Sequence, residues 1–254
     1  MMKKIALLCF LVASLTSSFA QETTPKKTSS RPDIPGTFVL EIGLNRALGA
    51  PNQFKQGFWG SRALNIYYQY EIRILKSRFS LVPGIGFSLE RWKFKDGRIL
   101  GYNADSVGTE LRLWAPSRLG YTGGVRKSQL VTNYFEIPVE LCYRTRPDDP
   151  ARSFKIAIGG RIGYLFDSFS KVKYKEDGQT KHLKDKQDYE LSKIRYGLTA
   201  RIGVGNVSLF GYYNLNPLFE SGKGPWNVSG SGSTEVKARK DYSTMTIGIS
   251  LASF

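Results

Sequence analysis

The sequence predicts an all-β fold, an eight-stranded antiparallel up-and-down transmembrane β-barrel that follows an N-terminal signal peptide. Three observations predict it. About eight segments after residue 36 alternate apolar and polar side chains with a period of two, which is typical of strands. The connections between them alternate between long and short, as they do when tight turns close one end of a barrel and long loops the other. The first residues carry the three regions of an export signal.

The N-terminal segment is predicted to lie outside the barrel. Residues 1–20 contain two lysines, an apolar run over residues 5–15 and small residues before the expected cleavage, so they are predicted to be a signal peptide. The apolar run is too short to cross a bilayer as a helix. Residues 21–36 are rich in Thr, Ser, Pro and Lys, which predicts a flexible periplasmic leader. Residues 37–254 are then the outer-membrane β-barrel domain.

The first four predicted strands place large apolar side chains on one face. They cover about residues 37–45, 61–74, 78–94 and 131–144. In the second of them, Leu64 and Ile66 share a face opposite Asn65, which is the period of a strand. Pro83 and Pro138 fall inside the third and fourth strands. Because proline cannot donate a ladder hydrogen bond, they predict bends or bulges.

The last four predicted strands repeat this alternation. They cover about residues 153–167, 193–204, 207–215 and 242–254. The sixth strand is the clearest, because Ile194 and Tyr196 face one way and Arg195 faces the other. The seventh strand has a mixed pattern. The whole segment therefore accounts for eight strands.

The connections between the strands predict both the topology and the orientation. Short connections are expected at residues 75–77, 146–151 and 205–206, and long ones at residues 46–60, 95–130, 168–191 and 216–241. In a soluble sandwich this strict alternation would be a coincidence. It favours a barrel in the cell outer membrane, with a periplasmic N-terminus and four long extracellular loops.

The face opposite the apolar one carries charges that are predicted to point into the lumen. These residues are Glu41, Glu71, Glu90, Glu136, Glu140, Lys155, Arg161, Lys193, Arg195 and Arg201. Carboxylates lie on the first four strands, and cations dominate the fifth and sixth. Eight strands leave an interior just wide enough for side chains, and an isolated buried charge is very costly. We therefore predict a lumen plugged by ion pairs rather than an aqueous pore.

Aromatic residues near the strand ends favour a membrane barrel over a soluble one. They are Trp92, Tyr143, Phe154, Tyr164, Phe166, Tyr196, Tyr212, Tyr213 and the C-terminal Phe254. Aromatic girdles lie at these depths in membrane barrels. In a soluble barrel the charged face would lie in water instead, and periodicity alone does not distinguish the two.

The composition limits the classes of partner and cofactor that are expected. A formal net charge of +16 indicates anionic partners. Nucleic acid is not predicted, because an exported chain rarely meets it and no recognition-helix pattern is present. Outer-membrane lipid and the phosphates of lipopolysaccharide are the predicted partners, with a solvated basic surface as the alternative. Cys142 is the single cysteine after the expected cleavage, so we expect no intramolecular disulfide, no zinc motif and no cofactor.

Several segments of the chain carry a family resemblance. They are residues 135–139 (FEIPV), 158–165 (IGGRIGYL), 195–203 (RYGLTARIG), 216–219 (NPLF), 222–225 (GKGP) and 247–251 (IGISL). Together they resemble the small outer-membrane barrels of the Bacteroidota, the PorT-like group. The resemblance covers most of the chain after the leader and implies an eight-stranded barrel in the outer membrane. It also implies a family with one component linked to protein secretion, and it brings no catalytic residues.

The single histidine is the strongest catalytic candidate. His182 lies beside Lys181 and Lys184 in the third long connection. Outer-membrane hydrolases use a histidine with a carboxylate or a serine, and no second catalytic element accompanies His182. A solvated surface histidine is therefore the preferred interpretation. No catalytic, cofactor-binding or metal-binding residue is predicted.

The second long connection interleaves basic and aromatic residues that are predicted to contact a lipid or a partner. These residues are Arg98, Arg112, Trp114, Arg118, Tyr121, Arg126 and Lys127. A loop of this length can carry structure of its own or bind a partner. The hypothesis is contact with lipopolysaccharide phosphates or with another envelope protein, and the alternative is a mobile polar loop.

The predicted function is that of an integral outer-membrane β-barrel protein of structural or accessory type. A link to protein secretion or envelope assembly follows from the resemblance alone. Two alternatives stay open, an outer-membrane barrel enzyme acting on lipid or peptide and a soluble exported ligand-binding barrel. The enzyme predicts an activity that depends on His182, and the soluble barrel predicts extraction without detergent.

Overall fold

The computed structural model describes most of the chain after the leader. The described residues are 36–50, 54, 59–102, 111–116, 124–176, 178–225, 227–229, 236–238 and 241–253. The predicted signal peptide, residues 21–35 of the predicted leader, and Phe254 lie outside them. No helix among the described residues is long and apolar enough to cross a membrane.

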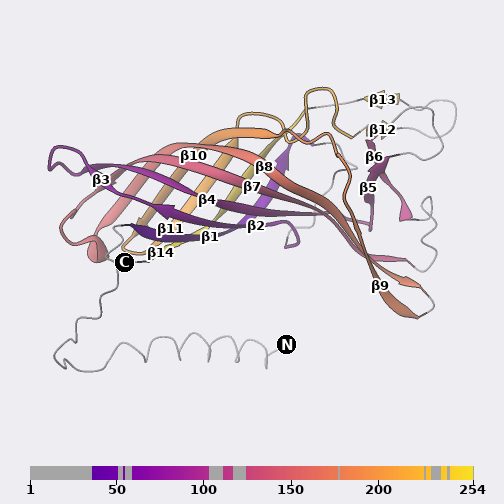
Figure 1. Ribbon diagram of the computed structural model, residues 1–254, viewed down its shortest axis with the longest axis horizontal. Coiled ribbons are helices and arrows are strands. Elements are labelled where there is room, and N and C mark those ends of the chain that lie inside the picture. Colours follow the sequence, from indigo (N-terminus) through magenta and orange to yellow (C-terminus); the bar gives the residue numbers. More distant parts are fainter. Residues whose placement is uncertain are drawn as a thin grey trace. The chain divides into compact units, whose positions relative to one another are not determined.

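Eight antiparallel strands form a closed ring (Figure 1). They are β1 (Thr37–Leu48), β2 (Arg62–Gln69), β4 (Phe79–Lys93), β7 (Val125–Arg144), β8 (Phe154–Glu176), β10 (Ile194–Val204), β11 (Val207–Asn214) and β14 (Ser243–Ala252). Each strand pairs with the next along the chain, and β14 pairs back onto β1. The predicted fold class, an eight-stranded up-and-down barrel, is confirmed.

The short and long connections lie at opposite ends of the ring. Residues 74–78, 145–153 and 205–206 form the short-turn end. Both termini of the ring lie there too, because Val39 near the start of β1 pairs with Ala252 at the end of β14. The four long connections form the long-loop end. The alternation expected from the sequence is therefore present in the structure.

The long connections carry more structure than the predicted loops. Strands β7 and β8 extend well past their predicted ends and stay paired as far as Val125 and Tyr174. The hairpin strand β9 (Gln179–Asp185) pairs with the end of β8. Two further hairpins pair β5 (Ile99–Tyr102) with β6 (Leu111–Trp114), and β12 (Asn227–Ser229) with β13 (Val236–Ala238).

The two prolines interrupt the ring at one place. The second predicted strand divides into β2 and the short β3 (Ile72–Arg73). Between them, the backbone N–H of Tyr70 donates to the carbonyl oxygen of Pro83 at 2.9 Å. Beside Pro83 and Pro138, the pairing of β4 with β7 breaks off and then resumes in the same register. The irregularity predicted from these prolines is therefore a local gap.

The ring is apolar outside and charged inside. Phe38, Ile158 and Leu209 on the outer face are 62%, 59% and 61% exposed, whereas Glu41 and Glu136 on the inner face are 0% exposed. A soluble barrel has the reverse arrangement, with apolar residues inside. A continuous outer face of large apolar side chains is stable only when lipid covers it, so the soluble alternative does not fit this structure.

Candidate functional site: the barrel lumen and its two ends

Arg161 on β8 is the centre of the lumen. Its Nη1 and Nη2 donate to Oε2 and Oε1 of Glu41 on β1, both at 3.0 Å. Nη2 also donates to the hydroxyl of Thr199 on β10 at 3.0 Å, and Nη1 to the Tyr67 hydroxyl on β2 at 2.9 Å. Both charged side chains are fully buried. This bidentate pair therefore joins four strands across the interior.

Arg201 on β10 extends the network toward the short-turn end. Its Nη2 donates to Glu41 at 2.8 Å and to Glu140 on β7 at 3.1 Å. Its Nη1 donates to the side-chain oxygen of Gln69 on β2 at 3.2 Å. Glu41 is thus shared by two guanidinium groups. The shared carboxylate keeps both cations paired in a place that water reaches poorly.

Arg195 on β10 forms the second half of the network, toward the long-loop end. Its guanidinium lies 2.9 Å from Glu90 on β4 and 2.8 Å from Glu136 on β7. The guanidinium carbon lies 3.7 Å from the centre of the Tyr134 ring, which is close enough for a cation–π contact. The Tyr67 hydroxyl donates to Glu136 and so links the two halves.

Two aromatic residues predicted for the outer girdle lie inside the lumen. Trp92 is 0% exposed and Tyr212 is 3% exposed. The Tyr212 ring lies 5.1 Å from the guanidinium carbon of Arg161, and the indole N–H of Trp92 donates to Thr132 at 3.3 Å. The girdle prediction was wrong for these two, because nearness to a strand end does not say which face a residue occupies. The other described aromatic residues of that prediction are half-buried or exposed on the outer face.

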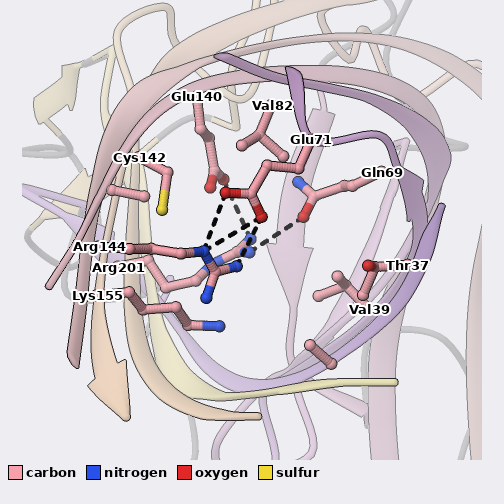
Figure 2. A pocket seen from close by; sticks show the side chains of 12 residues that line it. Thr37, Val39, Gln69, Glu71, Val82, Glu140, Cys142, Arg144, Lys155 and Arg201 are labelled. Atoms are coloured by element: carbon pink, nitrogen blue, oxygen red, sulfur yellow. Dashed lines mark hydrogen bonds and ion pairs between the residues drawn. The ribbon is translucent and has the colours of Figure 1, made fainter. Parts of the chain in front are cut away.

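The short-turn end holds a small polar cavity of about 40 Å³ (Figure 2). Arg144 and Glu71 form an ion pair there at 2.8 Å, and Gln69 and Arg201 line the inner side. Lys155 also lines the cavity, is 6% exposed and has no ion pair among the described residues. This end of the lumen therefore has a local excess of positive charge.

The structure brings nine of the ten predicted lumen residues together and separates Lys193 from them. Glu71 lies outside the strands at the rim and pairs with Arg144, which the prediction did not include among the lumen residues. Lys193 precedes β10 and is exposed, so its predicted place in the lumen was wrong. The physical reason is that β10 begins at Ile194, and a residue beyond the strand end no longer follows the inward alternation.

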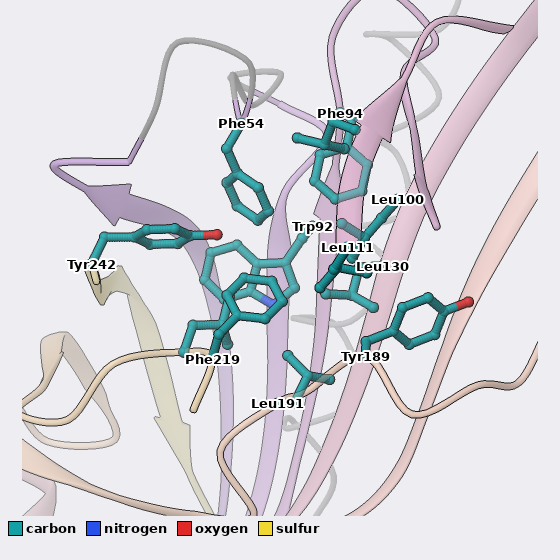
Figure 3. Packing of buried hydrophobic residues seen from close by; sticks show 12 residues of the cluster. Phe54, Trp92, Phe94, Leu100, Leu111, Leu130, Tyr189, Leu191, Phe219 and Tyr242 are labelled. Carbon is teal, nitrogen blue, oxygen red and sulfur yellow. The ribbon is translucent and has the colours of Figure 1, made fainter. Parts of the chain in front are cut away.

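The long-loop end is filled by an apolar cap (Figure 3). The cap is the cluster of Phe54, Trp92, Phe94, Leu100, Leu111, Leu113, Leu130, Tyr189, Leu191, Leu218, Phe219 and Tyr242. All four long connections contribute to it. The Phe54 ring centre lies 5.0 Å from those of Phe94 and Tyr242 and 6.0 Å from that of Phe219. The cap follows directly on the ion pairs, because Trp92 belongs to the cap and contacts the lumen residue Thr132.

Truncating the apolar cap should open the long connections without unfolding the ring. We expect Phe219→Ala to cost about 3–5 kcal/mol locally, the usual cost of removing a buried Phe side chain. Limited proteolysis should then cut the connections faster, while the strands keep their hydrogen-exchange protection. The matched control is Leu183→Ala, since Leu183 is 44% exposed on β9. Equal cleavage rates for the two variants would show that the cap does not hold the connections.

The structure describes only part of the basic and aromatic set predicted in the second long connection. Arg98 and Trp114 donate to backbone carbonyls of their own hairpin, at 3.5 and 3.0 Å. The side chain of Arg112, and Arg118 and Tyr121 altogether, lie outside the described residues. Arg126 and Lys127 belong to β7 rather than to a loop.

A tyrosine joins the second and third long connections. The hydroxyl of Tyr102 on β5 donates to the backbone carbonyl of Asp188. Burial, followed by the nearby carboxylates of Glu190 and Asp188, raises the pKa of Tyr102 to about 12. The phenol therefore stays protonated and keeps this hydrogen bond through the neutral pH range.

Among the residues that the structure describes, the side chain of the catalytic candidate His182 has no hydrogen-bond or ion-pair partner. His182 lies on β9, is exposed and sits opposite Lys173. Among the described residues, no group of three His, Cys, Asp or Glu side chains could hold a metal ion. Cys142 is a buried free thiol in the wall of the short-turn cavity.

The chain was compared with protein-family models and with curated proteins. The model of a family described as "outer membrane protein beta-barrel domain" matches residues 19–220. No curated protein matches the chain. The closed ring of strands and the match to the family model thus indicate the same class of protein.

Several solved barrels are similar at low identity. The attachment invasion locus protein Ail of Yersinia pestis is 14% identical, and the match covers 87% of this chain and 100% of that one at a TM-score of 0.29. Neisserial surface protein A is 13% identical, with 85% and 95% covered at a TM-score of 0.31. A major outer membrane protein from Thermus thermophilus is 14% identical, with 86% and 99% covered at a TM-score of 0.30.

Proposed function

Because this chain belongs to the family of the outer membrane protein beta-barrel domain, we propose that it is a closed barrel of structural or accessory type, without a conducting pore. The observation that carries the proposal is the unbroken sequence of contacts along the lumen. Ion pairs around Arg161, Arg195 and Arg201 fill the middle, and the apolar cap fills the long-loop end. A barrel of eight strands has room for little else.

The ion pairs that fill the lumen should make the barrel rigid. Arg161, Arg195 and Arg201 each contact carboxylates from other strands, so a movement of one strand disturbs several buried pairs. Breaking a buried pair is strongly unfavourable. The interior therefore works as a fixed support for the long connections, which are the parts free to meet a partner.

Closure of the lumen is tested by conductance. We expect the purified protein in planar bilayers to give no unitary current steps, even at high voltage. The variant Phe219→Ala should also stay silent, because the ion pairs around Arg161 still fill the middle of the barrel. A conducting porin in the same bilayers is the control. Regular unitary steps from the wild-type protein would contradict the proposal.

We propose that the N-terminus is periplasmic and that the four long connections face the outside of the cell. Short turns on the periplasmic side and longer loops outside are the rule for such barrels. Protease added to intact cells should then cut within the long connections and spare residues 74–78. Cleavage only at residues 74–78 would show that the orientation is the opposite of the one proposed.

The resemblance to the PorT-like barrels of the Bacteroidota supports a more specific role in protein secretion or envelope assembly. No part of the described structure favours catalysis, so we propose no enzymatic activity. Outer-membrane lipid, lipopolysaccharide and an envelope or secretion protein are the proposed partners. Affinity purification from the native envelope tests the last of these. A secretion role predicts co-purification of secretion components that is lost when the long connections are shortened.

A further inference from the structure

Five cations gather on the outer wall of the barrel near the long-loop end. They are Arg62 on β2, Arg91 and Lys93 on β4, Lys127 on β7 and Lys171 on β8. Arg62 lies directly opposite Arg91 in the ladder, and Lys93 and Lys171 both lie opposite Gln129. The other four lie close enough to Lys127 for their charges to act on its ammonium group.

This cluster has no counter-charge in the described part of the chain. None of the five side chains takes part in an ion pair there, although the lumen and the loops contain many. Like charges at such short range repel, and they are stabilised only by an anion or by water. On a wall that otherwise faces lipid, the charges of this cluster must be neutralised by anions or solvated by water from outside the protein.

A groove connects the cations to the apolar wall. Its volume is about 260 Å³, and it is lined by Arg62, Arg91 and Lys127 together with Ile42, Leu64 and Leu89. Ile42 is 53% exposed and Leu64 is 36% exposed, so both offer apolar surface to a neighbour. Along β2 and β4, the outward positions pass directly from the cations to the apolar band. The cations therefore lie at the edge of the band, where lipid headgroups begin.

We propose that this basic groove binds a multiply phosphorylated glycolipid of the outer leaflet, with its phosphates on the five cations and its acyl chains against Ile42, Leu64 and Leu89. Charge complementarity supports this occupant, since five cations exceed what one phosphodiester can neutralise. The apolar lining supports a lipid rather than a free phosphate ion. The inference rests on the proposed orientation, because it places the groove in the outer leaflet.

The site differs from the one expected from the sequence. The second long connection was the expected contact, and Lys127 is the one residue that the two sites share. The other four cations come from three further strands, β2, β4 and β8, which only the barrel register brings together with β7.

Binding of purified bisphosphorylated lipid A to the full-length protein in detergent tests the proposal. Native mass spectrometry should show one retained lipid A and a weaker response to phosphatidylglycerol. The variant Arg91→Gln/Lys93→Gln/Lys127→Gln should lose affinity by roughly 100-fold, since each cation near anionic lipid contributes about a factor of five. The remaining affinity should fall further in high salt.

The matched control removes three cations at the opposite end. Lys76→Gln/Arg146→Gln/Arg152→Gln changes the net charge equally, because all three side chains are exposed at the short-turn end. It should bind lipid A as the wild type does. Equal binding by the groove variant and the wild type would overturn the proposal, and so would equal affinity for phosphatidylglycerol. The assay uses neither conductance nor orientation in cells, so its failure is distinct from failure of the proposed function.

Discussion

Replacing Arg161 with methionine is expected to destabilise the barrel by about 3–5 kcal/mol, the usual cost of breaking a buried ion pair. The substitution removes both bonds to Glu41 and those to Thr199 and Tyr67. Methionine fills much of the same space but offers no donor. Glu41 keeps Arg201 and Asn65 as partners, so the protein should still fold. Urea unfolding of the protein in lipid vesicles measures the loss.

Two further variants separate the charge from the packing. Adding Glu41→Gln to Arg161→Met should restore part of the loss, because a neutral amide no longer requires a counter-ion. Arg73→Met is the control, since the Arg73–Asp148 pair has the same chemistry but side chains that are 37% and 86% exposed. An exposed pair contributes about 0–1 kcal/mol. Equal losses for Arg161→Met and Arg73→Met would show that the lumen network contributes little.

Replacing Gly159 with valine is expected to prevent normal assembly of the barrel. A Cβ atom at Gly159 would lie 2.1 Å from the carbonyl oxygen of Val139 and 2.6 Å from the Cα of Glu140. Both are backbone atoms of β7, so no side chain can move away to relieve the contact. The two longest strands would have to separate, at a cost above the roughly 1–3 kcal/mol of ordinary overpacking.

Folding of the Gly159 variant is measured by heat-modifiable mobility on gels, which distinguishes the folded barrel from the unfolded chain. The control is Gly211→Val, because a Cβ at Gly211 meets no atom within 4 Å and faces the lipid side. Valine is otherwise a good strand residue. We expect the folded band to be lost for Gly159→Val and kept for Gly211→Val. Folded bands of equal strength would mean that β7 and β8 tolerate a wider spacing.

The ring could be predicted from the sequence because strand periodicity is local. Leu64 and Ile66 alternate with Asn65 whatever lies across the barrel, and the same alternation assigns Glu41, Arg161 and Arg201 to the interior. The face is less certain at strand ends. Lys193 shows this, because it precedes β10 and no longer follows the alternation. Trp92 was assigned to the outer girdle from its place near a strand end, although the alternation of β4 puts it on the inner face with Glu90.

The apolar cap and the basic groove could not be predicted in the same way. Phe54, Phe94 and Tyr242 come from three separate connections, and no spacing in the sequence reveals that their rings meet. The extensions of β7 and β8 were missed because their outer face carries Lys127, Lys171, Lys173 and Lys175 in place of the large apolar residues that mark the other strands. These features depend on register between strands, which is a property of the closed ring.

The pairing of β14 with β1 has a consequence for the order of synthesis. Val39 and Ala252 stand near opposite ends of the chain, and the ring closes only when both are present. Until then β1 and β11 each expose an unpaired edge, which lipid cannot hydrate. A chain that ends before β14 therefore cannot close the ring by itself, and we expect the ring to close in the membrane only after β14 has been synthesised.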